Sequence, residues 1–139
     1  MIGSFDVKST QVFFYAQPQG NYDVRKSIIP FPKVKYNVGG GFNANGTFTA
    51  PVSGTYFFYF NGLNSEDMND AEVRLYLNGF DQSIDSYASS SSETMTLDAT
   101  LKLKKGDRVE LILVYGTLET EAYNSFSGFL IEEDLSFSI

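Results

Sequence analysis

The sequence predicts an all-β sandwich built from about ten short strands, in the manner of a jelly roll. Apolar residues recur in short runs with a period of two, and clusters of Gly, Asn, Asp and Ser separate the runs. No long stretch has the 3.6-residue period of an amphipathic helix. Aromatic residues make up 16% of the 139 residues, with 13 Phe and 9 Tyr, and aromatic side chains favour strands.

The first expected strand covers residues 12–16, VFFYA, and Pro18 ends it. Residues 28–36 contain Pro30 and Pro32. Proline cannot donate a hydrogen bond to a neighbouring strand, so this run is expected at a sheet edge or to be interrupted.

The Gly- and Asn-rich residues 39–46 predict a loop, because both residue types tolerate positive φ. Residues 39–44 also fit a dinucleotide-binding glycine motif loosely, but a strand and not a helix follows, so the turn interpretation is preferred. A short strand is expected over residues 47–50, and Pro51 ends it. A turn then leads into a strand that runs from Gly54 to about Leu63.

The heptapeptide GTYFFYF that begins this strand is aromatic on both faces. Alternate side chains of a strand point to opposite sides, so Tyr56, Phe58 and Phe60 line one face and Phe57 and Tyr59 the other. A strand with one solvated face would alternate apolar with polar residues. We therefore expect one face in the sandwich core and the other against a second sheet or a second subunit.

Residues 72–77 alternate charged or tyrosine side chains with Val or Leu, as in a strand with one wetter face. Asn78-Gly79 is a strong signal for a two-residue hairpin turn. A weaker strand is expected over residues 83–87, and the serine-rich residues 88–92 follow it as a loop.

A long period-2 series runs from Met95 to Leu103, a Lys-Lys-Gly-Asp turn follows, and the alternation resumes from Val109 to Tyr115. The last expected strand covers residues 126–131. Neither an internal repeat nor a linker marks a second domain. We therefore expect residues 11–139 to form a single domain, preceded by an N-terminal leader or linker of residues 1–10.

The composition excludes several kinds of site. The chain has no Cys, which excludes a thiolate nucleophile, a thiolate zinc site and a disulfide framework. It has no His either, which removes the usual base of serine and cysteine hydrolases and the commonest transition-metal ligand. Paired carboxylates for glycoside hydrolysis stay open from the sequence alone, but we expect no enzyme. The net charge of −7 makes nucleic acid and anionic membrane poor partners, and no apolar run is long enough to insert through a bilayer.

One spaced set of residues consists of Phe31, Asn37, Phe42, Phe48, Gly54, Tyr56, Phe58 and Phe60. This set resembles the signature of the C1q domain, the globular head of complement C1q. The interval from Phe42 to Phe48 is one residue short, and it falls in a loop, where a deletion is easily absorbed. The resemblance continues through residues 73–79, 101–113 and 126–131, the last including Gly128, and so covers about residues 12–131 in order.

The resemblance implies a ten-stranded jelly-roll sandwich, C1q/tumour necrosis factor-like, that is secreted and assembled as a homotrimer. The acidic tail at Glu132-Glu133-Asp134 looks more like invertebrate C1q-domain-containing proteins than vertebrate ones. Phe57 and Tyr59, on the second face of the aromatic strand, would lie at the trimer interface.

Three groups of polar residues are candidates for binding or modification. Glu66, Asp67 and Asp70 could chelate calcium, a cation that takes clustered oxygens, although a solvated acidic loop is the simpler interpretation. Asn45 begins an Asn-Gly-Thr glycosylation sequon on the expected loop, or serves only in the turn. The basic hairpin of residues 102–108 could meet an anionic ligand, or could protect a sheet edge.

The leading functional hypothesis is a non-enzymatic, multivalent recognition module that binds glycans or other microbial or cell-surface ligands in innate immunity. Residues 64–70, 79–83 and 116–124 are the candidate ligand-facing loops. The alternatives are a secreted signalling or adhesion ligand for a protein receptor, and a structural trimerisation head. Calcium is the one cofactor candidate.

Overall fold

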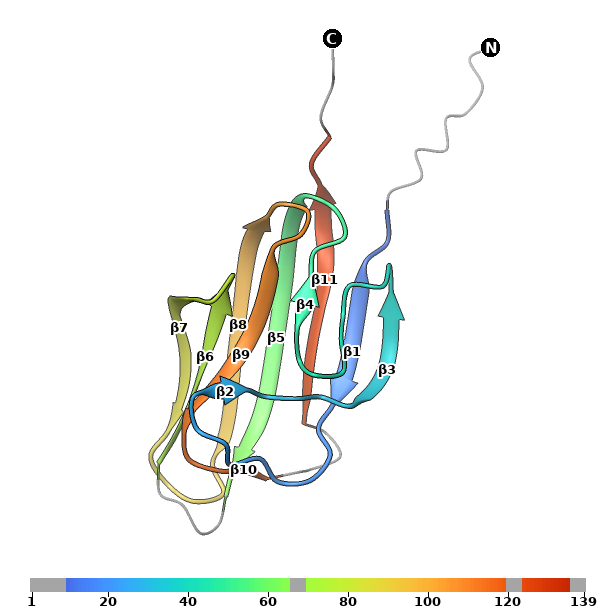
Figure 1. The fold of residues 1–139 in the computed structure, drawn as a ribbon. Coiled ribbons are helices and arrows are strands. Elements are labelled where there is room, and N and C mark those ends of the chain that lie inside the picture. The colour runs from blue at the N-terminus through green and yellow to red at the C-terminus, as the bar shows by residue number, and fades with distance from the viewer. Residues whose placement is uncertain (1–9, 66–69, 120–123, 136–139) are drawn as a thin grey trace, which may run out of the picture.

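The computed structural model describes residues 10–65, 70–119 and 124–135. Within these ranges the chain forms eleven strands and no helix (Figure 1). The strands are β1 (Phe13–Gln17), β2 (Ser27–Ile28), β3 (Lys33–Val38), β4 (Phe48–Thr49), β5 (Gly54–Asn64), β6 (Ala71–Leu77), β7 (Phe80–Ala88), β8 (Thr94–Leu103), β9 (Arg108–Tyr115), β10 (Leu118–Glu119) and β11 (Ser125–Glu133).

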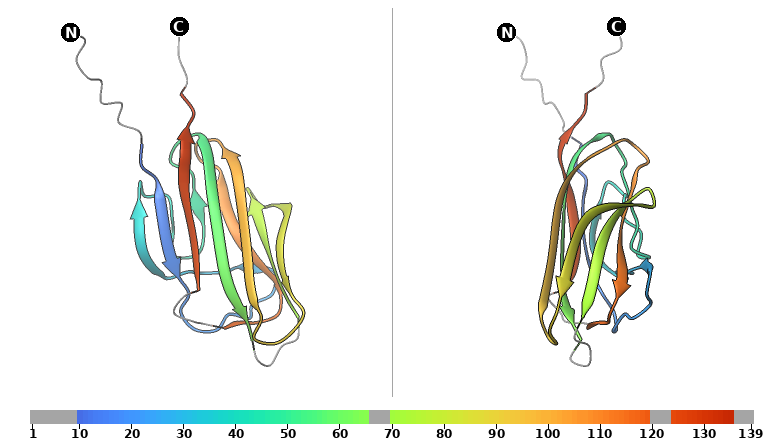
Figure 2. Two further views of the ribbon diagram at one scale, coloured as in Figure 1. Left: turned by 180° about the vertical axis from the view of Figure 1, so that it is seen from behind. Right: turned by 90° about the vertical axis from the view of Figure 1, so that its left-hand side faces the viewer.

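The strands make two antiparallel sheets, which lie face to face as two layers (Figure 2). In sheet A, β5 pairs with β8 along one edge and with β11 and β10 along the other, and β1 and β3 follow β11. In sheet B, β9 pairs with β6 on one side and with the short β2 and β4 on the other, and β7 lies beyond β6. This arrangement confirms the predicted all-β jelly-roll sandwich. The sequence predicts about ten strands, and the two-residue β10 is the one that its pattern does not indicate.

The prolines interrupt residues 28–36 as predicted. β2 lies at the edge of sheet B and β3 at the edge of sheet A, so the Pro30-Phe31-Pro32 segment carries the chain from one sheet to the other. The predicted hairpin at Asn78-Gly79 is also present, with φ values of 51° and 83° and Leu77 paired with Phe80. Positive φ at both central residues is the mark of a type I′ turn. β7 therefore begins at Phe80, three residues before its predicted start.

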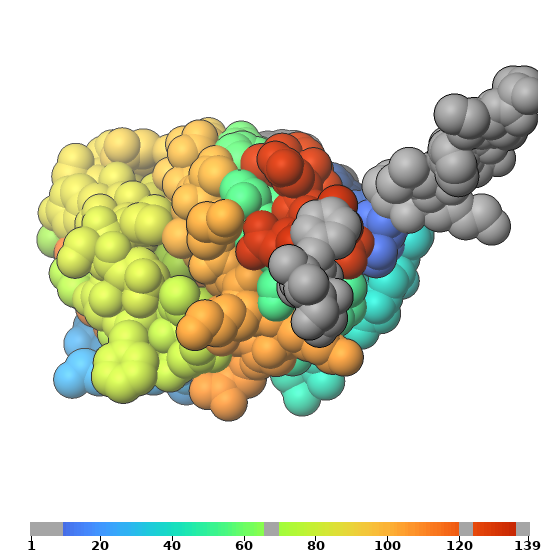
Figure 3. All heavy atoms as spheres, turned by 90° about the horizontal axis from the view of Figure 1, so that it is seen from above, coloured from blue at the N-terminus to red at the C-terminus, as the bar shows by residue number. Residues whose placement is uncertain are grey.

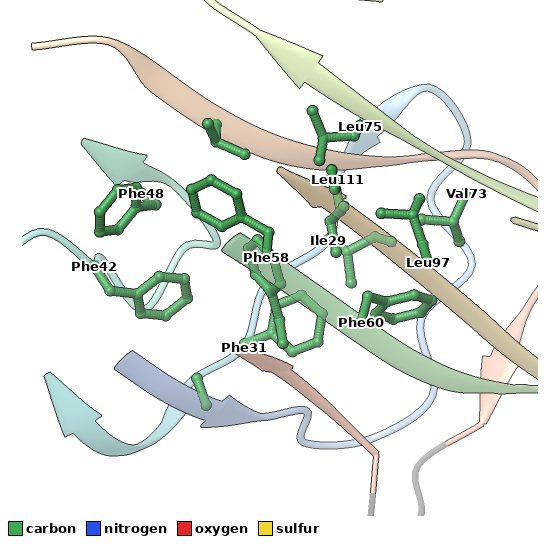
Figure 4. Close-up of a cluster of buried hydrophobic side chains, with 14 of the residues drawn as sticks. Ile29, Phe31, Phe42, Phe48, Phe58, Phe60, Val73, Leu75, Leu97 and Leu111 are labelled. Atoms are coloured by element: carbon green, nitrogen blue, oxygen red, sulfur yellow. The ribbon is translucent and has the colours of Figure 1, made fainter. Parts of the chain in front are cut away.

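The core lies between the sheets and is rich in phenylalanine (Figure 4). Tyr56, Phe58 and Phe60 of β5 point into it and are at most 1% exposed, which confirms the predicted inner face. Phe14 stacks on Phe42, with ring centroids 4.4 Å apart, and meets Phe126 edge-on at 5.0 Å. Such geometries add to the stabilisation that aromatic burial gives.

The residues that carry the C1q resemblance are mainly structural. Phe31, Phe42 and Phe48 are buried in the same core. The Asn37 side chain closes the loop after β3, because its Nδ2 donates to the Phe42 carbonyl at 2.9 Å and its Oδ1 accepts the Phe42 N–H at 3.1 Å.

Two glycines of the same set lie where a side chain would collide. A Cβ at Gly54 would lie 2.4 Å from the Glu132 carbonyl oxygen, and a Cβ at Gly128 would lie 2.7 Å from both Phe14 and Phe58.

β1 begins and β11 ends at the same end of the sandwich (Figure 1). Figure 3 looks onto this end, where atoms of the turns at residues 78–79 and 104–107 also lie. The two turns are tied together, because Asn78 Nδ2 donates to Asp107 Oδ1 at 3.0 Å and the Arg108 N–H donates to Asn78 Oδ1 at 2.8 Å.

Candidate functional site

A band of aromatic side chains crosses the outer face of sheet A, and we call it the aromatic band. Phe13 of β1 lies opposite Phe129 of β11, and Phe129 lies opposite Phe57 of β5, so one residue from each of three adjacent strands falls in line. The members are Phe13, Tyr15, Tyr36, Phe57, Tyr59 and Phe129.

The aromatic band is open to solvent in the single chain. Phe13 is 38% exposed, Phe129 47% and Tyr36 61%. Phe57 and Tyr59 are half-buried, in contrast to their fully buried neighbours along β5. The rings contact one another within the sheet, with the Phe57 and Phe129 centroids 5.7 Å apart, but no second layer covers them in the described chain. An exposed apolar surface of this kind marks an interaction site.

The band has a polar side and an apolar side. At β8, Phe57 lies opposite Thr100 and Tyr59 opposite Asp98, so the surface turns polar there. Toward the other end of the same face, residues 10–15, residues 127–133 and Leu135 line a groove that includes the exposed Ile131 and Leu135. The apolar surface therefore runs from the middle of sheet A to the end where β1 begins and β11 ends.

The sequence identifies only part of this surface. It places Phe57 and Tyr59 on the second face of β5, as the structure does. It gives no sign that Phe13 and Phe129 extend the band, because that depends on the register between strands far apart in the chain. A period-2 signal is present at both positions, but it does not say which face of which sheet they share.

The candidate calcium residues are only partly placed. Glu66 and Asp67 lie outside the described residues. Asp70 is exposed immediately before β6, and its Oδ1 accepts a hydrogen bond from the Tyr87 hydroxyl at 3.3 Å. Within residues 10–65, 70–119 and 124–135, no three His, Cys, Asp or Glu side chains are grouped in a way that could hold a metal ion.

Asn45, the candidate glycosylation site, is exposed on the loop between β3 and β4. Its backbone N–H donates to Asn43 Oδ1 at 2.8 Å, which fixes the turn, and the Thr47 hydroxyl donates to Glu110 at 2.6 Å. The Asn45 side chain thus lies on an accessible, well-defined turn.

The basic side chains of the hairpin at residues 102–108, namely Lys102, Lys104, Lys105 and Arg108, are exposed around the turn between β8 and β9. Lys102 forms an ion pair with Asp134 at 3.5 Å, so part of the positive charge is used within the chain. Within the described ranges, the chain contains no helix that is long and apolar enough to cross a membrane.

The structure does not bring the three candidate ligand-facing loops together. The described parts of residues 64–70 and 116–124 lie at the end of the sandwich remote from the start of β1 (Figure 1). Residues 79–83 lie at the opposite end, and most of them belong to β7.

Comparison with known proteins gives consistent results. The family model of the C1q domain matches residues 13–131. Complement C1q tumor necrosis factor-related protein 3 of Mus musculus and that of Homo sapiens are each 38% identical over 128 residues, which are 88% of this chain and 52% of the relative. The chain thus spans about half the length of the curated relatives it matches.

Solved structures share the fold at lower identity. The globular domain of zebrafish complement 1qA protein has a TM-score of 0.71 at 22% identity and covers 88% of this chain and 99% of its own. Eiger TNF from S. frugiperda has a TM-score of 0.70 at 16% identity, covering 94% and 98%. Murine APRIL has a TM-score of 0.69 at 13% identity, covering 86% and 98%.

Proposed function

The chain belongs to the C1q domain family, and from this premise we propose that it is a non-enzymatic binding module that acts as a secreted homotrimer. C1q and TNF-like ligand domains are families of binding proteins and not of enzymes. The observation that carries the proposal is the aromatic band on the outer face of sheet A.

The energetics of the band favour assembly. Burying one large apolar side chain stabilises by roughly 1.5–3 kcal/mol. Each chain presents Phe13, Tyr36 and Phe129 at 38–61% exposure, and Phe57 and Tyr59 lie beside them. Three copies arranged around one axis would remove all of these rings from water without exposing a new apolar edge, because a ring of copies closes on itself. The polar border at Thr100 and Asp98 marks where such an interface would end.

The ligand of the assembled head is proposed to be a protein on a cell surface. The curated relatives carry a tumor necrosis factor-related name, and Eiger TNF and murine APRIL share the fold. These likenesses support the signalling alternative above the glycan and microbial ligands of the leading sequence hypothesis. Linked copies raise apparent affinity by roughly 10²–10⁴ without new contacts, so a weak site on each chain suffices.

The assembly is tested by the mass of the protein in solution. Phe129→Asp places a charge in the middle of the aromatic band and is expected to convert trimer to monomer while the far-UV circular dichroism spectrum is unchanged. Phe80→Asp is the matched control, because Phe80 is 73% exposed on sheet B and lies outside the band. Sedimentation equilibrium of both variants and the wild type decides the question. A monomeric wild type, or a Phe129→Asp variant that stays trimeric, would refute the proposal.

The ligand class is tested with the same two proteins. The trimer is expected to bind a saturable protein component on cells, and the Phe129→Asp monomer is expected to bind it far more weakly. A glycan array probed with the trimer is expected to give no specific signal. Strong binding to one class of glycan, together with loss of cell binding after the glycan is removed, would favour the recognition hypothesis instead.

A further inference from the structure

The outer face of sheet B holds a second aromatic surface, at the end remote from the start of β1 (Figure 1). There Glu72 of β6 lies between Tyr87 of β7 and Tyr115 of β9, each of which is its partner in the strand register. The two tyrosine rings meet edge to face, with centroids 6.4 Å apart and an interplanar angle of 73°. Together with Asp70, which immediately precedes β6, these residues form what we call the tyrosine patch.

The patch carries an excess of negative charge. Glu72 is only 7% exposed, and its carboxylate accepts a hydrogen bond from Arg74 Nε at 2.7 Å. The same guanidinium also donates to Asp81 at 2.7 Å, so one cation is shared between two carboxylates. Asp70 Oδ1 accepts a hydrogen bond from the Tyr87 hydroxyl. No cation pairs with Asp70 among the described residues. Three carboxylates and one guanidinium therefore leave this part of the sheet with an excess of two negative charges.

The negative charge affects the pKa of both tyrosines. Partial desolvation, followed by the nearby carboxylates of Asp70, Glu72 and Glu93, raises the pKa of Tyr87. Partial desolvation and Glu72 likewise raise the pKa of Tyr115. Both side chains are neutral phenols at physiological pH, and an aromatic face attracts a cation placed over it.

The patch stays accessible in the proposed assembly. Tyr87 is 51% exposed, and the outer face of sheet B points away from sheet A and its aromatic band. An assembly formed through sheet A would leave one tyrosine patch open on each copy.

We propose that the tyrosine patch binds a lysine or arginine side chain of a protein ligand. The cation would lie over the face of the Tyr87 ring, and the Asp70 carboxylate would pair with its charge. The excess negative charge on this part of the sheet favours such a ligand over an anionic or neutral one. The chain as a whole, at −7, attracts basic partners to it. This deepens the proposed function and depends on it for one point, that the ligand is a protein.

The probe is a short arginine-rich peptide, titrated into the intact protein by isothermal calorimetry at low and at physiological ionic strength. One peptide is expected to bind per chain, and a peptide with glutamate in place of arginine is expected not to bind. Tyr87→Leu is expected to weaken the binding by about 3- to 30-fold, the range of a partly desolvated cation–π contact. Tyr87→Phe keeps the ring and is expected to keep most of the affinity.

Two controls separate this site from general electrostatics and from assembly. Phe80→Leu changes a ring at the other end of β7 that is even more exposed, at 73% against 51% for Tyr87, and is expected to have no effect. Asp70→Asn should weaken the binding, and excess calcium should not replace the peptide. Binding that is the same for Tyr87→Leu and the wild type, or a calcium ion that competes for the site, would overturn the proposal.

The mass of each variant is measured in the same samples. A monomeric wild type that still binds the peptide would refute the trimer and leave the patch standing. A trimer with no peptide binding would do the reverse. A loss of mass in Tyr87→Leu would show that the patch joins copies of this chain and would overturn its assignment to a ligand.

Discussion

Gly128→Ala is expected to destabilise the protein, although alanine in place of glycine usually stabilises a strand. The alanine Cβ would lie 2.7 Å from Phe14 Cε1 and 2.7 Å from Phe58 Cδ1. Carbon atoms in contact prefer a separation of about 3.5–4.0 Å, so both rings would have to move by close to an ångström. Neither is free to move, because Phe14 and Phe58 are at most 2% exposed and each packs on further rings.

The magnitude follows from two opposing effects. Overpacking of a close-packed core costs about 1–3 kcal/mol. The lower entropy of an unfolded chain with alanine offsets about 0.4–1 kcal/mol of this. The free energy of unfolding is therefore expected to fall by about 1–2 kcal/mol.

Urea denaturation followed by far-UV circular dichroism measures the change, at one fixed protein concentration because assembly is linked to folding. Phe58→Leu provides the background that tests the cause. A shorter side chain at position 58 makes room for the alanine methyl group, so Gly128→Ala should cost about 1 kcal/mol less in that background. An equal cost in both backgrounds, or a Gly128→Ala variant as stable as the wild type, would show that the collision does not govern this position.

Three further predictions concern the loops. Asn37→Ala removes both hydrogen bonds to Phe42 and is expected to lower the free energy of unfolding by about 1–2 kcal/mol, measured by urea denaturation. The hydrogen bond from Asn78 lowers the pKa of Asp107, so the stability that this carboxylate adds is present above its ordinary pKa of 3.8 and is lost as the pH falls through the lowered value. Asp107→Asn should therefore be less stable than the wild type at pH 7, with the difference in urea midpoint vanishing in strong acid; a constant difference would contradict this. Secretion from a eukaryotic cell should attach a glycan at Asn45, seen as a mass shift that an N-glycosidase and Asn45→Gln both abolish.

Local sequence patterns predict much of the fold because successive side chains of a strand face two different environments, and their polarity alternates accordingly. The alternation in β5 distinguishes Phe58 from Phe57, and Asn78-Gly79 determines a turn through its own backbone preferences. The interruption of the strand at the prolines after β2 is equally a local effect. These features need no knowledge of the neighbouring strands.

The two surfaces could not be predicted in this way. The aromatic band exists because Phe13, Phe129 and Phe57 share a register across strands that are distant in sequence. The burial of Glu72 depends in the same way on Tyr87 and Tyr115, which flank it from two different strands. Because a shift of one residue in register would turn each side chain to the other face, sequence periodicity alone cannot assemble either surface.

β1 begins and β11 ends at the same end of the sandwich, and this has a practical consequence for orienting the molecule. A biotin, an affinity tag or a fused scaffold joined directly before β1 or directly after β11 would be attached at that end of the sandwich, and the tyrosine patch lies near the opposite end of sheet B. Coupling a biosensor surface next to β1 or β11 would therefore present the tyrosine patch to the flowing analyte, whereas random coupling through lysines would leave the patch covered in part of the molecules.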